Sequence, residues 1–325
     1  MAYLLVTRRI GTALLTAQHP LIITSRLGRN PRAVSPLLML STLLVIPVIS
    51  TIPQALNCPF SHPYSLGVTY LETHTSHLKS ADVIFVIDSG LPWLPGNQAP
   101  PSSARIFVID DADPLQANVG YSDIPAELVC RADAEIALTQ LLETIQDIMG
   151  QGTRIGEGAR ESKAIQDRGK TLREEHQRQI ELWDALEVGY LDSSRESTLS
   201  LPVLLGTVRK GIQTLTPSKG NKVLVLNESV TNLTPVWNHI RPETPGHILS
   251  SGGSSLGWSL GAAVGASLGA QVSGKDFELI VVIVGDGSFM FSVPSTAFWM
   301  ARRYQTVRHI ITHFLTAESS SNSPS

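Results

Sequence analysis

The stretch "IVVIVGDGSFMFSVPSTAFWMARRY", residues 280–304, brings a carboxylate to the end of an apolar run. Ile280–Val284 is apolar throughout, which is typical of a strand buried on both faces of a parallel sheet. The run leads directly into Gly285, Asp286 and Gly287. In open parallel sheets, ligands bind at the carboxyl ends of the strands. The sequence therefore predicts that Asp286 stands at a ligand-binding edge.

The residues around this carboxylate favour a phosphate-bearing ligand held through a metal ion. Gly285 and Gly287 carry no side chain, so a ligand can approach the backbone closely, and free N–H groups there can receive phosphate oxygens. A carboxylate repels phosphate unless a divalent cation lies between them, and Mg²⁺ prefers carboxylates, carbonyls, water and substrate phosphates. The alternative is a turn in which Asp286 caps the following helix, and the tripeptide alone favours that turn.

Length and composition set the limits of the interpretation. The 325 residues are enough for two domains, and 42% apolar with 16% charged residues suits a globular protein. A formal net charge of -3 gives no reason to expect nucleic acid as a partner. The two cysteines, Cys58 and Cys130, cannot form a disulfide framework and predict ordinary thiols.

The first part of the chain bears on localisation. It has five arginines and no acidic residue before Glu72, a pattern that is typical of a mitochondrial presequence. Chance in an apolar folded segment is the preferred alternative, so cytoplasmic and mitochondrial locations both stay open. The apolar start "AYLLV" is too short for a secretory signal, so secretion is not expected. Ser35–Thr51 is too short for a membrane span and is interrupted by Pro47, so a buried helix leading into a strand is expected instead.

Apolar runs and amphipathic segments alternate along the chain and predict an α/β fold. Strands are expected at 20–25, 81–89 and 104–113, each an apolar run, and the last two turn acidic at their carboxyl ends. Helices are expected at 36–44 and 132–149. We therefore predict two Rossmann-like parallel-sheet units with flanking helices, the second incomplete. The first unit covers residues 1–150, a charged linker with a helix covers 151–195, and the second unit covers 196–325.

The second unit contains an unusual glycine pattern. A strand is expected at 222–229, and the helix that follows it carries Gly257, Gly261, Gly265 and Gly269 at intervals of four residues. Glycine weakens a helix by about 1 kcal/mol relative to alanine. This row of glycines, the glycine stripe, therefore predicts that a neighbouring backbone approaches closely along it.

These two segments together resemble a known family. "SSGGSSLGWSLGAAVGASLGA" followed by "VVIVGDGSFMFSVPSTAFWMARRY" resembles the cofactor-binding domain of thiamine diphosphate enzymes, in the branch of acetolactate synthase and benzoylformate decarboxylase. "ADVIFVIDSGLPWLP" and "RIFVIDDADPL" are similar to the central domain of the same family. The resemblance covers most of residues 15–306.

The resemblance implies roles for individual residues. Asp286 matches the Mg²⁺ ligand, and the backbone from Gly285 through Gly287 to Ser288 would hold the diphosphate. Leu256 matches the bulky residue that bends the cofactor, although a plain core leucine is the alternative. The backbone around Ser254 would receive the aminopyrimidine. Whether the central domain also carries FAD, as in some relatives, the sequence does not show.

Two departures from the family pattern limit what the resemblance implies. The family begins with a pyrimidine-binding domain that supplies an activating glutamate, and no residue here matches it, so no catalytic residue is assigned. Glu228 lies in the wrong domain and is expected to cap a helix or lie at the surface. A second metal ligand, an asparagine, is expected some 25–28 residues after Asp286, where an ungapped count reaches Thr312 and His313. A short insertion that displaces the strand "HFLTAE" is the alternative.

Two classes of function follow from these observations. The first is a thiamine diphosphate- and Mg²⁺-dependent enzyme that joins or cleaves 2-oxo acids or aldehydes, a transferase or lyase. The second is a non-catalytic truncated relative, or a subunit fragment that needs another chain for the missing domain. A nicotinamide-binding protein is disfavoured, because no G-x-G-x-x-G follows a first strand. The family implies a homodimer or tetramer. The net charge and the short apolar segment predict no nucleic-acid or membrane partner.

Overall fold

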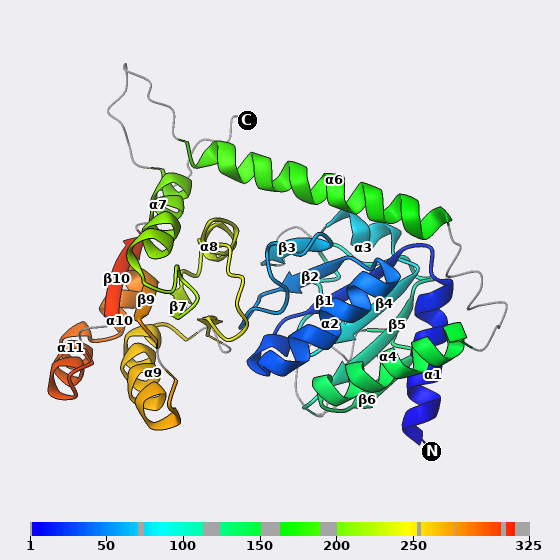
Figure 1. Cartoon of the computed structure of the whole chain (residues 1–325), viewed down its shortest axis with the longest axis horizontal. Helices are drawn as coiled ribbons and strands as arrows, with labels where there is room; N and C mark the ends of the chain where they lie inside the picture. The colour runs from blue at the N-terminus through cyan, green and yellow to red at the C-terminus, as the bar shows by residue number, and fades with distance from the viewer. Residues whose placement is uncertain are drawn as a thin grey trace. The chain divides into compact units, whose positions relative to one another are not determined.

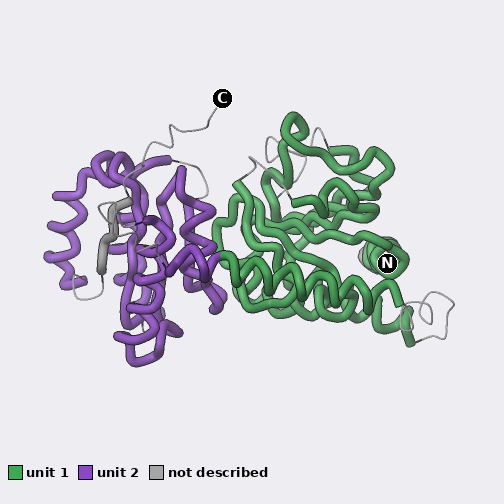
Figure 2. The backbone as a smooth tube through the Cα atoms, turned by 90° about the horizontal axis from the view of Figure 1, so that it is seen from above, with its two compact units in different colours: residues 1–182 green, residues 183–325 purple. Residues whose placement is uncertain are grey.

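The computed structural model describes residues 2–70, 75–112, 124–150, 163–188, 200–251, 255–275, 277–306 and 310–315, the last range by its backbone alone. Contacts between elements divide the chain into two compact units, unit 1 (residues 1–182) and unit 2 (residues 183–325) (Figure 2). Both are α/β units whose described strand pairs are all parallel, which confirms the predicted fold class. That the second unit is incomplete stays a prediction.

Unit 1 is built on a six-stranded sheet in the order β3-β2-β1-β4-β5-β6 (Figure 1). The strands are β1 (Pro20–Thr24), β2 (Val48–Thr51), β3 (Ser65–Thr69), β4 (Val83–Ile87), β5 (Arg105–Asp110) and β6 (Leu128–Arg131). The helices are α1 (Ala2–Thr16), η1 (Leu27–Arg29), α2 (Pro31–Leu44), α3 (Ser76–Ser80), α4 (Ala134–Gly150) and α6 (Lys163–Leu186). Every residue of β1 and β4 is buried, as their unbroken apolar runs predict.

Alternate residues of the central strands enter two different cores. Ile22, Phe85 and Phe107 pack with α1, α2 and α4 on one face of the sheet. Leu21, Ile84 and Val108 pack on the other face, together with Leu78 of α3. This division follows from the period of two residues with which side chains alternate along a strand.

The N-terminal segment is part of the first of these cores. Ile10 and Ala13 of α1 are fully buried, and a Cβ on Gly11 would lie 3.1 Å from Ile145 of α4. The arginine-bearing segment is thus part of the fold of unit 1, which was the preferred alternative to a mitochondrial presequence. Both cytoplasmic and mitochondrial locations remain predictions. None of the described helices is long and apolar enough to cross a membrane.

The helix expected within the linker packs along unit 1 up to Leu182. Arg168 of α6 donates hydrogen bonds to the carbonyl oxygens of Leu44, Val45 and Gln18, at 2.7, 2.8 and 2.9 Å. Leu172, one turn further on, is buried. Because Arg168 and Leu172 are four residues apart, they lie on one face of the helix. Charged residues surround them in the sequence and hide this face from pattern analysis.

Unit 2 contains a four-stranded sheet in the order β10-β9-β7-β8. The strands are β7 (Val223–Glu228), β8 (Ile248–Ser250), β9 (Leu279–Gly285) and β10 (Ile310–Leu315). The helices are α7 (Leu201–Leu215), α8 (Leu233–Ile240), α9 (Ser259–Ser273), α10 (Asp286–Phe291) and α11 (Pro294–Arg303). Leu224, Val282 and Val284 pack against Leu260 and Ala263 of α9, which covers one face of the sheet.

Candidate functional site

The sheet of unit 2 reverses its direction of strand addition between β7 and β9. From β7 the chain moves to β8 on one side, and it then returns through α9 to β9 on the other side. The carboxyl ends of β7 and β9 therefore flank the crevice in which open α/β sheets bind ligands. Glu228 ends β7 and Gly285 ends β9. The expected ligand-binding edge is thus the carboxyl edge of these two strands.

Asp286 is the first residue of α10 and is exposed at this edge. Gly285 precedes it in an extended conformation, with φ -71° and ψ 155°. The Asp286 carboxylate accepts a hydrogen bond from the N–H of Gly287 at 2.8 Å. A Cβ on Gly287 would meet no described atom within 4 Å, whereas Ser288 is buried. The carboxylate is therefore accessible, and the space beside the following backbone is open.

The loop that carries Leu256 lies beside the end of α10. Gly257 has φ +89°, and a Cβ there would lie 3.0 Å from the backbone N and Cα of Ser292. Only glycine permits both this conformation and this approach. Leu256 itself is 41% exposed, so it is not a core leucine in this chain.

The glycines within α9 have more open surroundings than Gly257. A Cβ on Gly261, Gly265 or Gly269 would meet no described atom within 4 Å. The close backbone approach that the stripe predicted therefore occurs at Gly257 alone. For the three helical glycines the close approach stays a prediction, because the described part of unit 2 places no backbone against that side of α9.

Glu228 holds the loop that leads into α9. Its Oε1 accepts hydrogen bonds from the backbone N–H groups of Gly257 and Trp258, the latter at 3.3 Å. Its Oε2 accepts from the N–H of Ser259 at 2.9 Å and from the Ser259 hydroxyl. The side chain is buried and caps the start of α9 from β7. Of the two roles expected for Glu228, capping is the one the structure shows.

The expected position of the second metal ligand depends on the register of β10. This strand pairs in parallel with β9, so that His313 lies opposite Ile283 and Leu315 lies opposite Gly285. Thr312 therefore lies opposite Val282, and the partner position of Asp286 is outside the described residues. The short insertion stays an alternative. The side chains of Thr312 and His313, and the whole of Ser254, lie outside the described residues.

Unit 1 contains a second polar cluster, at the carboxyl ends of β1, β4 and β5. Carboxylate oxygens of Asp88, Asp110 and Asp111 lie within 4.8 Å of one another. Burial first, and then the neighbouring carboxylates, raise the pKa of Asp88 to about 7. Arg26 forms ion pairs with Asp110 and, at 3.1 Å, with Asp111. Because Arg26 already supplies positive charge to this cluster, its geometry is that of a structural ion-pair network.

Comparison with known proteins points to the same part of unit 2, the residues that follow β7 and include β9. Residues 229–313 match the family model described as thiamine pyrophosphate enzyme, C-terminal TPP binding domain. The resemblance to thiamine diphosphate-dependent enzymes is confirmed. The matched range includes Leu256 and Asp286. No curated protein matches the chain.

Solved structures share the fold over nearly the whole chain. One, assigned as a thiamin diphosphate-dependent enzyme from Mycobacterium smegmatis, has a TM-score of 0.66 and 19% identity, covering 98% of this chain and 54% of its own. Benzoylformate decarboxylase from Polynucleobacter necessarius gives 0.65 and 19%, with 95% and 51% covered. The thiamine diphosphate-dependent 4-hydroxybenzoylformate decarboxylase of Rhodococcus jostii gives 0.62 and 19%, with 95% and 50% covered. The chain therefore spans about half the length of these structures.

Proposed function

We propose that unit 2 binds thiamine diphosphate through Mg²⁺, as part of an enzyme of the acetolactate synthase or 2-oxo acid decarboxylase type. The observation that carries the proposal is the exposed carboxylate of Asp286, at the reversal point of the sheet and within the matched TPP-binding segment. The substrates would be 2-oxo acids or aldehydes, and the reaction would be carboligation or C–C cleavage.

The residues present fit such a group in charge and in space. An exposed carboxylate is a ligand that Mg²⁺ accepts, and the metal would neutralise the diphosphate beside it. Asp286 now accepts the Gly287 N–H at 2.8 Å. A metal that draws the carboxylate away would leave this N–H for a phosphate oxygen, together with the N–H of Ser288. The open space at Gly287 leaves room for that approach.

The remaining residues of the site would orient the cofactor. When bound, thiamine diphosphate supplies the electron sink for the carbanion that remains when a 2-oxo acid loses carbon dioxide. Leu256 would support its bent form from the loop that Glu228 holds through the N–H groups of Gly257 and Trp258. Ser254 stays the proposed neighbour of the aminopyrimidine.

A second candidate function rests on how much of the matched structures this chain covers. Because the chain spans about half of its structural neighbours, we also propose the alternative of a non-catalytic relative or subunit fragment that acts together with another chain. A homodimer or tetramer is proposed for either case. We expect a subunit fragment to release carbon dioxide from pyruvate once a separately produced pyrimidine-binding domain is added, and a non-catalytic relative to release none.

Titration calorimetry with thiamine diphosphate and Mg²⁺ tests the binding itself. We expect saturable binding that needs the metal and that falls at least about tenfold in Asp286→Asn, since the carboxylate supplies the metal with a charged ligand. Asp147→Asn, on the exposed side of α4 in unit 1, is the matched control and should bind like the parent chain. Equal affinity of the two variants would show that Asp286 is not a metal ligand.

A further inference from the structure

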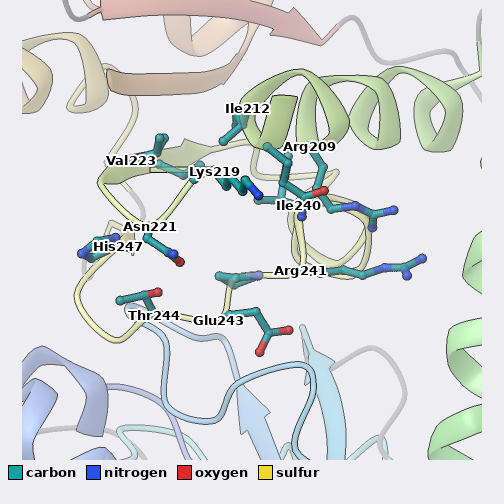
Figure 3. A pocket seen from close by; sticks show the side chains of 14 residues that line it. Arg209, Ile212, Lys219, Asn221, Val223, Ile240, Arg241, Glu243, Thr244 and His247 are labelled. Atoms are coloured by element: carbon teal, nitrogen blue, oxygen red, sulfur yellow. The ribbon is translucent and has the colours of Figure 1, made fainter. Parts of the chain in front are cut away.

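A pocket lies at the opposite edge of the unit 2 sheet from Asp286. Its volume is about 150 Å³, it is open to solvent on one side, and it is lined by α7, by the loop before β7 and by the loop before β8 (Figure 3). Lys219 and Asn221 come from the first loop, and Thr244 and His247 come from the second. All of its lining residues belong to unit 2. This site is thus distinct from the proposed cofactor site and does not rest on it.

Two of the three strongly basic residues at this pocket are already neutralised. Arg209 donates to Oε2 of the buried Glu187 at 2.6 Å, and Arg241 donates to its Oε1 at 3.1 Å. Arg241 also pairs with Asp184 at 2.8 Å. In Figure 3 both guanidinium groups extend away from Asn221 and His247. These arginines therefore build the wall, and their charge is not available to a ligand.

Lys219 is the cation that the pocket leaves available. No described residue forms an ion pair or a side-chain hydrogen bond with its ammonium group. Its backbone is left-handed, with φ +53°, a conformation in which glycine is the unstrained residue. Figure 3 shows the Lys219 ammonium and the Asn221 amide pointing into the space between the two loops. A single positive charge and an amide donor thus face the pocket together.

His247 adds a buried polar atom without a partner. In the part of the chain that the structure describes, its Nδ1 is inaccessible to solvent and makes no hydrogen bond. The ring packs edge-on against Phe277, with 5.7 Å between centroids. Burial, and then Lys275, lower the pKa of His247, so the ring is neutral at neutral pH. A buried nitrogen without a partner costs stability, and the lining position of the ring makes it a reporter of what occupies the pocket.

The volume and the walls restrict what fits. The wall between the polar groups is apolar, formed by Ile212, Val223, Val225, Ile240 and Pro242. A space of about 150 Å³ accommodates about six non-hydrogen atoms, the size of benzene, inside the pocket. Glu243 also lines the pocket and disfavours a second negative charge on the ligand. We propose that this pocket binds a short monocarboxylate, with its carboxylate at Lys219 and its apolar body against these side chains.

NMR of the histidine ring protons tests the proposal on the whole chain. Isobutyrate, a monocarboxylate of about six non-hydrogen atoms, should shift the His247 signal in a saturable way, with millimolar or tighter affinity. The signal is assigned as the one that disappears in His247→Gln. Inorganic phosphate is the second probe. If phosphate binds more tightly than isobutyrate, or if isobutyrate produces no saturable shift, the proposal is wrong.

Two matched variants test which lysine binds the carboxylate of the ligand. Lys219→Gln and Lys222→Gln each remove one positive charge from the same loop, and Lys222 does not line the pocket. We expect isobutyrate affinity to fall about tenfold in the first and to stay unchanged in the second. Lys219→Gly removes the ammonium while relieving the left-handed backbone, so it keeps the fold and should lose affinity to the same extent. Equal affinities in all four chains would overturn the assignment of Lys219.

Discussion

At the scale of single residues, the carboxylate of Asp88 links the ionisation of unit 1 to its stability. The folded chain raises the pKa of Asp88 from 3.8 to about 7, chiefly through burial. Between these two pH values the folded state keeps a proton that the unfolded chain has released. The stability that this group contributes is therefore present in full below about pH 4 and is lost as the pH rises to about 7.

Asp88→Asn should remove the loss of stability that occurs between about pH 4 and pH 7. Asparagine tolerates the left-handed backbone of Asp88, φ +45°, and its amide oxygen can accept the N–H of Asp111 as the carboxylate does at 3.2 Å. In urea unfolding, we expect the variant to match the parent near pH 4 and to exceed it by up to about 4 kcal/mol above pH 7. Asp147→Asn serves as control, and an advantage of Asp88→Asn that does not change with pH would contradict the assignment.

Glu228 supports the loop before α9 of unit 2 through four hydrogen bonds. Glutamine in its place keeps one acceptor, but its NH₂ group would face the N–H and hydroxyl of Ser259, which are donors. We expect Glu228→Gln to lower the free energy of unfolding by about 1–3 kcal/mol. Glu278→Gln, whose carboxylate accepts from Ser218 in a half-buried setting, should cost less. A larger loss in Glu278→Gln would show that Glu228 does not support the loop.

At the scale of elements, the sequence predicts what depends on local pattern. The fully apolar runs at 83–87 and 280–284 give buried parallel strands because no polar residue interrupts them. The partner of Glu228 could not be foreseen, since Gly257 lies 29 residues further on and only the fold brings the two together. Likewise, the sequence does not predict the packing of α6 on unit 1, because Arg168 resembles a solvated charge until its three carbonyl partners are known.

The glycines of α9 provide a test of what covers that helix. Gly265→Ala should stabilise unit 2 by up to about 1 kcal/mol, because alanine is the better helix former and its Cβ meets no described atom. Gly257→Ala should destabilise it, because the Cβ would lie 3.0 Å from Ser292 in a left-handed backbone. Urea unfolding of the purified chain measures both. A loss of stability or of oligomeric mass in Gly265→Ala would instead show that another chain packs against α9.

At the scale of the whole molecule, two units with separate cores should unfold in two steps. The cores of unit 1 surround one sheet, and the core of unit 2 joins α9 to another. In scanning calorimetry at about pH 8, Asp88→Asn should raise only the transition of unit 1. Thiamine diphosphate with Mg²⁺, at about 100 times its dissociation constant, should stabilise only unit 2, by about 2.7 kcal/mol. This second shift should vanish in Asp286→Asn. A single transition that responds to both changes would show that the two sheets unfold as one cooperative unit.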